Sequence, residues 1–278
     1  MSNSIYKSPE GEKSILEFYE KKLNDWPVQK ELISITTRFG NTFAIASGDI
    51  KDPPLILLHG SSTNSLMWMG DVKEYSKDFR VYALDIIGEP GKSAPSRPEF
   101  NTHAYSEWLK DIFDFLKIKK ASFVSISLGG WIALNFSIAN PEKVEKLVLL
   151  CPSGLAKPRL SFLFKVMPLM FLGDFGLRWI NKIIYYKEPV NEEVNKFGKL
   201  IFSYYNPRFD NLPIFSDGEL SKLTMPVYYL GGEKDALLRS QESANRLTKL
   251  LPAAKVEVLK ETGHVIINVK DKVLKFMK

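Results

Sequence analysis

FVSISLGG, residues 123–130, is an apolar run that stops at a serine and is followed by two glycines and a helix-like apolar pattern. A strand that turns sharply into a helix at Ser127 lifts the side chain of that serine out of the fold. Such a turn needs small residues two positions before and after the serine, here Ser125 and Gly129, because bulk there would collide with the backbone. The stretch predicts a reactive serine. For this stretch alone, an ordinary strand-to-helix turn remains the alternative.

Strand and helix patterns alternate along most of the chain, which favours a mainly parallel sheet covered by helices on both faces. Most of the strands are short, continuous apolar runs, as expected for strands buried on both faces. The expected strands are residues 32–37, 42–46, 55–58, 79–84, 123–126, 144–151, 226–231 and 254–259. The expected helices besides the one after Ser127 are residues 11–25, 66–76, 103–117, 240–251 and 265–277.

Between residues 155 and 222 the alternation stops, and helix-like patches rich in aromatic residues and methionine are separated by prolines. This pattern predicts a helical cap, or lid, inserted into a core domain made of residues 1–154 and 223–278. The apolar side chains of the cap form either a pocket over Ser127 or a surface that packs on the core. They are Phe162, Phe164, Met167, Met170, Phe171, Phe175, Trp179 and Tyr185.

Length and composition are those of one globular α/β domain with an insertion: 278 residues, 45% of them apolar. The net charge of +6 comes from 38 basic and 32 acidic side chains without a long basic block, so nucleic acid is not an expected partner. The single cysteine, Cys151, is expected to be a buried hydrophobe in a reducing compartment. The N-terminus has no signal-peptide pattern, and residues 160–172 are too short and interrupted to span a bilayer. We therefore expect a cytoplasmic location and no membrane span.

A serine hydroxyl becomes a useful nucleophile when a base takes its proton and an acid orients that base. Of the three histidines, His264 lies in the loop after the last expected strand, and Asp235 lies just after residues 226–231. Because the carboxyl ends of parallel strands meet at one edge of a sheet, both residues are expected near Ser127. His103 is interpreted as a surface or helix-capping residue, and Glu233 is the alternative acid.

These motifs together resemble the α/β-hydrolase superfamily over most of the chain. The turn at Ser127 resembles its G-x-S-x-G nucleophile elbow, with Ser125 in place of the first glycine, and the order Ser127, Asp235, His264 is its usual order. The segment DIIGEPGKS, residues 85–93, resembles a structural D-x-x-G-x-G-x-S turn with one extra residue. The resemblance implies an α/β-hydrolase fold with a mostly parallel eight-stranded sheet flanked by helices and a helical cap insertion. Ser127 argues against the dehalogenases of this superfamily, which use aspartate.

The negative charge that develops on a substrate oxygen must find hydrogen-bond donors already in place. The N–H of Leu128, next to the nucleophile, is the first expected donor of this oxyanion hole. The segment LLHGSS, residues 57–62, resembles the H-G-x segment of the superfamily and implies the N–H of Ser61 as the second. In that interpretation His59 shapes the loop and does not act as a base.

The expected function is that of a serine hydrolase of the small capped carboxylesterase type, cleaving esters of small or medium apolar acids. Its expected partner is a small-molecule ester, and no metal or organic cofactor is expected, because no cluster of histidines and carboxylates has ligand spacing. Two alternatives stay open. The same triad could act on thioesters, lactones, C–C bonds or perhydrolysis, or the scaffold could bind a ligand or signal.

Overall fold

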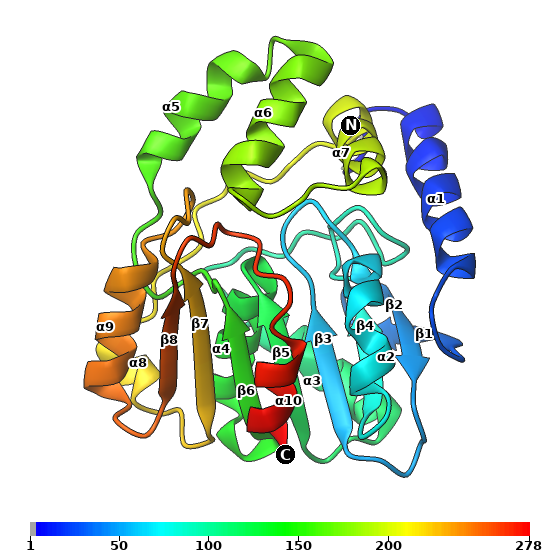
Figure 1. The fold of residues 1–278 in the computed structure, drawn as a ribbon. Coiled ribbons are helices and arrows are strands. Elements are labelled where there is room, and N and C mark those ends of the chain that lie inside the picture. Colours follow the sequence, from blue (N-terminus) through cyan, green and yellow to red (C-terminus); the bar gives the residue numbers. More distant parts are fainter. Residues whose placement is uncertain (1–3) are drawn as a thin grey trace.

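The computed structural model describes residues 4–278, and at its centre lies an eight-stranded sheet with strand order β1-β2-β4-β3-β5-β6-β7-β8 (Figure 1). β1 and β2 form an antiparallel hairpin, β2 pairs antiparallel with β4, and the remaining strands are parallel. The mostly parallel eight-stranded sheet expected from the sequence is therefore confirmed. The strands are β1 (Glu31–Thr37), β2 (Gly40–Ser47), β3 (Pro54–Leu58), β4 (Arg80–Leu84), β5 (Ala121–Ile126), β6 (Val144–Leu150), β7 (Val227–Gly232) and β8 (Lys255–Leu259).

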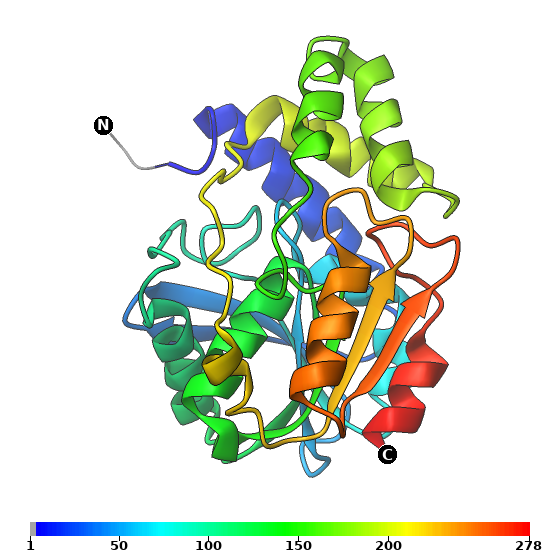
Figure 2. The same ribbon diagram turned by 90° about the vertical axis from the view of Figure 1, so that its left-hand side faces the viewer.

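Helices cover both faces of the sheet, as the two views of the ribbon show (Figures 1 and 2). One face packs on α3 (Ala104–Leu116), α4 (Leu128–Ala139) and α9 (Ser240–Leu250). The other face packs on α2 (Val72–Tyr75), α10 (Lys270–Met277) and part of α1 (Pro9–Asn24). The shorter helices are η1 (Ser65–Gly70), η2 (Pro141–Lys143) and α8 (Asp217–Leu220).

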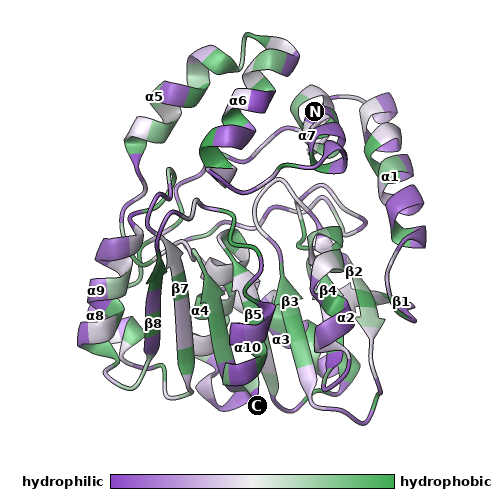
Figure 3. Ribbon diagram, in the orientation of Figure 1, coloured by the Kyte–Doolittle hydropathy of each residue, from purple (hydrophilic) through white to green (hydrophobic). Residues whose placement is uncertain are grey.

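Burial explains the sequence of the central strands. Every residue of β4 and β5 is buried, and in β3 only Pro54 is partly exposed. A strand covered by helices on both sides has no solvent-facing positions, so it has an apolar run where a half-exposed strand would alternate. Figure 3 shows this difference, with hydrophobic residues on the central strands and a mixture of hydrophilic and hydrophobic residues on the edge strand β8.

Three longer helices, α5 (Leu160–Leu169), α6 (Gly173–Tyr185) and α7 (Glu192–Tyr204), form a layer above the carboxyl edge of the sheet (Figures 1 and 2). All three lie within residues 155–222, the segment that is called the cap from here on. The layer also contacts α1, because Phe18 stacks on Phe197 of α7 with ring centroids 5.6 Å apart. α1 therefore ties the cap to the core from outside the insertion. None of the helices in residues 4–278 is both long and apolar enough to cross a membrane.

Two expected helices differ from the structure. The helix expected at residues 265–277 begins only at Lys270, so the prediction is wrong for residues 265–269. Asn268 has φ 60°, a left-handed conformation that a helix does not continue through, and this segment is part of a long loop after β8. The helix expected at residues 66–76 is divided at Asp71 into η1 and α2.

Candidate active site

Ser127 is the turn between β5 and α4, and its backbone is held in an unusual conformation with φ 52° and ψ −112°. Its N–H donates to Leu150 O at 3.1 Å, and its carbonyl accepts from the N–H of Ser153 at 3.1 Å. A methyl group added to Gly129 would lie 2.5 Å from Leu58 O. The glycine is needed because α4 starts directly against the end of β3, as a strained nucleophile elbow requires.

Ser125, where the superfamily usually has glycine, is fully buried, and its hydroxyl donates to Val148 O at 3.2 Å. The residue stands between β3 and β6, paired in register with Leu58 and Leu149. A serine at this position is tolerated because its hydroxyl finds an acceptor on the neighbouring strand, which removes the penalty of burying a polar group.

Asp235 and His264 are in contact: His264 Nδ1 lies 2.9 Å from Asp235 Oδ2, and both side chains are buried. Asp235 follows β7, and its other oxygen, Oδ1, accepts the N–H groups of Leu237 at 2.8 Å and Leu238 at 2.9 Å. Glu233, the alternative acid, is exposed and accepts instead from the N–H of Glu261. The structure thus brings together two of the three expected side chains and separates the alternative from them.

The charge of this pair is set by its surroundings. Burial alone would raise the pKa of Asp235, but the His264 imidazole and the two N–H donors together hold that pKa below its usual value. An ionised carboxylate can only accept, so Nδ1 is the nitrogen of His264 that donates to Asp235, and Nε2 is not used by this contact. This is the orientation required of a histidine that takes a proton from serine.

Ser127 lies at the same carboxyl edge of the sheet, at the end of β5, and β6 stands between β5 and β7. Its N–H bonds the last residue of β6, and the next residue, Cys151, places its sulfur within 4.8 Å of the ligand atoms of Asp235 and His264. Among residues 4–278, no hydrogen bond joins Ser127 Oγ to His264, although catalytic hydrogen bonds often tighten only when substrate is bound.

Cys151, Asp235 and His264 are also the only group with metal-ligand proximity in the described part of the chain. Burial is the main reason why the pKa of the Cys151 thiol lies well above its usual value, and the nearby Asp235 raises it further. A cation here would require a thiolate and would break the bond between Asp235 and His264. The three residues are better suited to a packed, protonated thiol beneath a carboxylate–imidazole pair.

The loop after β3 lies beside the elbow, since a methyl group added to Gly60 would be 3.6 Å from Ser127 Cβ. His59 is fully buried: Nδ1 donates to Gly60 O at 2.8 Å, and Nε2 accepts the N–H of Ile86 at 2.9 Å. Burial lowers the pKa of His59, so it is a neutral loop-shaping residue. Ser61 is exposed at the tip of this loop, and Leu128 is the first residue of α4, so its N–H has no intrahelical acceptor.

Glu89 is a buried carboxylate at this edge that the sequence analysis did not single out. Its Oε2 accepts the N–H of Ser62 at 2.6 Å and the hydroxyl of Tyr205 at 3.1 Å. Burial raises its pKa to about 7. In the sequence, the feature that could have pointed to Glu89 is the extra residue in the turn at residues 85–93. By contrast, Asp85 in the same turn has the expected structural role, accepting from Ser65 and Lys92.

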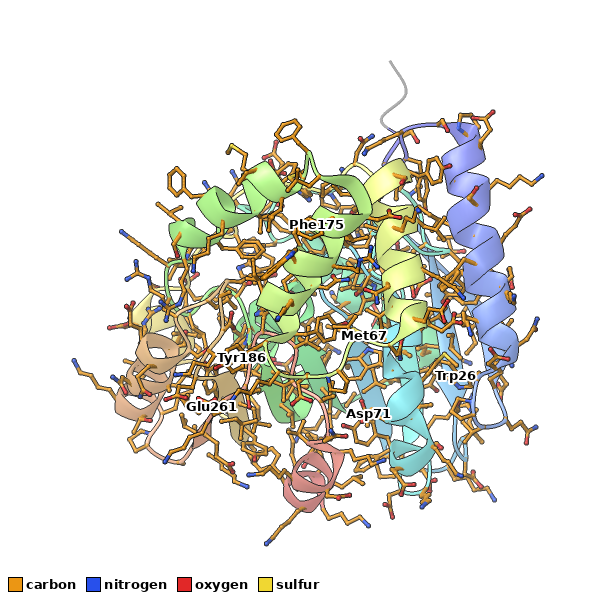
Figure 4. The ribbon with its side chains drawn as sticks, turned by 45° about the horizontal axis from the view of Figure 1, so that its top comes forward. Trp26, Met67, Asp71, Phe175, Tyr186 and Glu261 are labelled. Carbon is orange, nitrogen blue, oxygen red and sulfur yellow. The ribbon has the colours of Figure 1, made fainter. Side chains whose placement is uncertain are left out.

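The cap contacts the loop that holds His264. The N–H of His264 donates to Ile184 O, in the last turn of α6, at 2.9 Å. A methyl group added to Gly263 would lie 2.6 Å from the same oxygen. Tyr186, just after α6, donates its hydroxyl to Glu261 at 3.3 Å, and Figure 4 shows these two residues side by side. The histidine loop is therefore clamped by the end of a cap helix.

The apolar side chains of the cap are largely open to solvent. Phe164 is 76% exposed, Phe171 84% and Phe175 57%, and the ring of Phe175 lies 6.2 Å from that of Trp179. Of the eight apolar residues named from the sequence, Phe162 and Tyr185 are partly buried and the other six are exposed. The exposed large apolar residues of α5 and α6 and the turn between them are Leu160, Phe164, Met167, Met170, Phe171, Leu172, Phe175 and Trp179.

Comparison with known proteins agrees with this fold and site. Residues 53–182 match the family described as alpha/beta hydrolase fold. The chain is 34% identical over 259 residues to carboxylesterase YbfK of Bacillus subtilis, covering 89% of this chain and 86% of that protein. It is 32% identical over 277 residues to the uncharacterized carboxylesterase nap of B. subtilis, covering 96% of this chain and 92% of that protein.

Solved structures of carboxylesterases also resemble this chain. The crystal structure of carboxylesterase CesB (YbfK) from B. subtilis matches with a TM-score of 0.84 and 29% identity over 96% of this chain and 98% of that one. That of naproxen esterase (carboxylesterase NP) from B. subtilis matches with a TM-score of 0.87 and 29% identity over 98% and 100%. The chain belongs to the α/β-hydrolase family. Within that family, it is a protein of the carboxylesterase type.

The packing of Gly263 predicts that Gly263→Ala destabilises the protein and lowers its activity. The added methyl group would press on the carbonyl of Ile184, so either α6 or His264 must shift, at a cost of about 1–3 kcal/mol. Thermal unfolding and ester turnover measure both effects. Gly218→Ala is the matched control, because nothing lies within 4 Å of its added methyl group. Wild-type stability and turnover in Gly263→Ala would contradict the clamp.

The raised pKa of Glu89 predicts a specific pH dependence of stability. Burial favours its neutral form despite the opposing charges of Arg97 and Arg208 and the hydrogen bonds from Ser62 and Tyr205. Because the folded pKa of about 7 exceeds the usual 4.5, this stabilisation is complete below 4.5 and is lost as pH rises through 7. Relative to Glu89→Gln, the wild type should lose about 2–3 kcal/mol of unfolding free energy between pH 5 and 8, at roughly 1.36 kcal/mol per pKa unit. Urea denaturation of both proteins at each pH tests this, and parallel pH curves would refute it.

Proposed function

We propose that the protein is a serine hydrolase that cleaves carboxylic esters of small or medium apolar acyl groups through Ser127, His264 and Asp235. The observation that carries the proposal is the buried hydrogen bond between His264 Nδ1 and Asp235 Oδ2, at the edge where Ser127 turns out of the sheet. A paired carboxylate and imidazole beside a strained serine are the components that nucleophilic acyl transfer requires.

In the first step, Ser127 Oγ attacks the ester carbonyl carbon while its proton passes to Nε2 of His264. Asp235 stabilises the imidazolium without taking the proton. The carbonyl electrons move to oxygen, and the N–H groups of Ser61 and Leu128 hold the resulting oxyanion. The C–O bond to the leaving group then breaks, and the alcohol leaves with the proton from His264.

The second step repeats this chemistry with water. His264 takes a proton from a water molecule, the hydroxyl oxygen attacks the acyl carbon, and the same N–H groups hold the second oxyanion. Ser127 leaves, takes back the proton from His264 and is ready for another cycle, while the carboxylic acid is released. No other group is required for this sequence.

Two findings support an apolar acyl group. The exposed aromatic side chains of α5 and α6 are available to contact one, and a related solved structure is that of a naproxen esterase. The solved structures of a 2-hydroxy-6-oxo-6-phenylhexa-2,4-dienoate hydrolase and of a meta-cleavage product hydrolase are 21% and 23% identical to this chain, so their likeness concerns the fold alone.

The role of Ser127 is tested by labelling and turnover. Wild-type protein should react with a fluorophosphonate probe and hydrolyse a chain-length series of p-nitrophenyl esters, while Ser127→Ala should do neither, with a loss of at least about 10³-fold in kcat. The chain-length series also measures the acyl preference. Equal ester turnover by wild type and Ser127→Ala would remove the proposal.

The role of Asp235 is tested by Asp235→Asn, which keeps the shape of the side chain. The amide would donate to Nδ1 and leave the proton on Nε2 of His264, so kcat should fall about 10³–10⁴-fold with little change in KM. Glu233→Gln, two residues away and exposed, is the control and should retain wild-type turnover. The reverse pattern would move the acid from Asp235 to Glu233.

A further inference from the structure

The conformation of the loop at Ser61 depends on two consecutive peptide groups. The first joins Gly60 to Ser61, and its carbonyl accepts hydrogen bonds from His59 Nδ1 at 2.8 Å and Thr63 Oγ1 at 2.9 Å. Because the C=O and N–H of a trans peptide point in opposite directions, these bonds aim the N–H of Ser61 away from His59 and Thr63. Ser127 borders this peptide, with its Cβ 3.6 Å from the position of a methyl group on Gly60.

The second peptide group joins Ser61 to Ser62, and Glu89 holds it. The N–H of Ser62 donates to Glu89 Oε2 at the short distance of 2.6 Å. Ser62 has φ 58°, in the left-handed region that residues other than glycine rarely adopt. Such a conformation persists only when surrounding contacts impose it. Without the acceptor on Glu89, the strained conformation of Ser62 is no longer imposed, and the path of the loop at Ser61 changes with it.

The same carboxylate oxygen also bonds the cap. Tyr205 directly follows α7, is fully buried and donates its hydroxyl to Glu89 Oε2 at 3.1 Å. Arg97 donates to the oxygen of Tyr205 at 2.9 Å, and its guanidinium lies 5.3 Å from the centre of the tyrosine ring. Because Arg97 supplies a proton to the tyrosine oxygen, the single proton of Tyr205 is left for the two acceptors in reach, Glu89 Oε2 at 3.1 Å and Gly88 O at 3.2 Å.

Glu89 therefore touches both the loop beside Ser127 and Tyr205, at the end of α7. We propose that Glu89 is a positioning residue for the oxyanion hole, fixing the Ser61 N–H through Ser62 and tying it to the cap through Tyr205. This inference rests on the proposed esterase function. Glu89 does not touch the substrate; it acts on the transition state only through the direction of a backbone donor.

The test removes the acceptor in graded steps. Glu89→Ala deletes it and should lower kcat about 10²-fold, as the loss of one oxyanion donor does, with KM changed less than about threefold. Glu89→Asp keeps the carboxyl group but shortens the side chain by one methylene, so its kcat should lie between those of Glu89→Ala and the wild type. Glu89→Gln keeps an amide oxygen in reach of Ser62 and should restore kcat to within about fivefold. Glu99→Ala, an exposed glutamate in the following loop, is the control and should match the wild type.

A trifluoromethyl ketone separates positioning from a loss of folding. It adds Ser127 Oγ to its carbonyl carbon and leaves an oxyanion in the hole, so its inhibition constant should rise in Glu89→Ala by the factor that kcat/KM falls. Tyr205→Phe leaves the bond between Glu89 and Ser62 in place and removes the hydroxyl that bonds Glu89, Gly88 and Arg97, so it should give a smaller change in the same direction. Thermal unfolding confirms that each variant is folded at the assay temperature, and Glu89→Asp carries the test if Glu89→Ala does not fold.

The outcomes distinguish this inference from the proposed function. A wild-type protein that neither hydrolyses esters nor reacts at Ser127 overturns both. An active wild type with unchanged kcat and unchanged inhibition in Glu89→Ala and Glu89→Asp overturns the positioning role alone. Loss of activity in Glu89→Gln equal to that in Glu89→Ala also overturns it, because the hydrogen-bond acceptor would then not be what matters.

Discussion

A single buried hydrogen bond, from His264 Nδ1 to Asp235 Oδ2, is the contact on which the rest of the carboxyl edge depends. It fixes the side of the imidazole that carries the proton, and so leaves Nε2 free to act as a base. The contact requires that the turn after β7 and the loop after β8 lie close together. Gly232 makes this possible, because a methyl group there would lie 2.0 Å from Gly263 O.

Several residues with strained backbone conformations lie at this same carboxyl edge of the sheet. Ser62, Ser127, Cys151 and Glu261 all have positive φ, although none is a glycine. Each is held by a hydrogen bond from its own N–H to an acceptor on another segment: Glu89, Leu150, Leu230 and Glu233, respectively. Strain of this kind, of order 1–3 kcal/mol per residue, survives only where tertiary contacts impose it, and it is common at functional sites. The edge is consequently rigid although it consists of loops.

The cap makes two hydrogen-bond contacts with loops at the carboxyl edge of the sheet. It bonds the loop of His264 through Ile184 and the carboxylate of Glu89 through Tyr205, so it is connected both to His264 and to the loop at Ser61. Its exposed apolar side chains take no part in these contacts. The variation of caps on a common sheet is one way in which this fold supports many chemistries, and the reactive residues alone do not define the reaction.

The sequence by itself determined the sheet, the order of its elements and the expected position of Ser127, because buried strands, turns and small residues around a sharp bend are local properties. Only the tertiary structure shows that Asp235, and not Glu233, contacts His264, since two carboxylates in one turn differ in burial and in partner but not in local pattern. It also decided where the last helix begins and gave Glu89 its contacts with Ser62 and Tyr205. Those contacts join residues 27 and 116 positions apart along the chain, and no periodicity or motif reports which side chains meet across such separations.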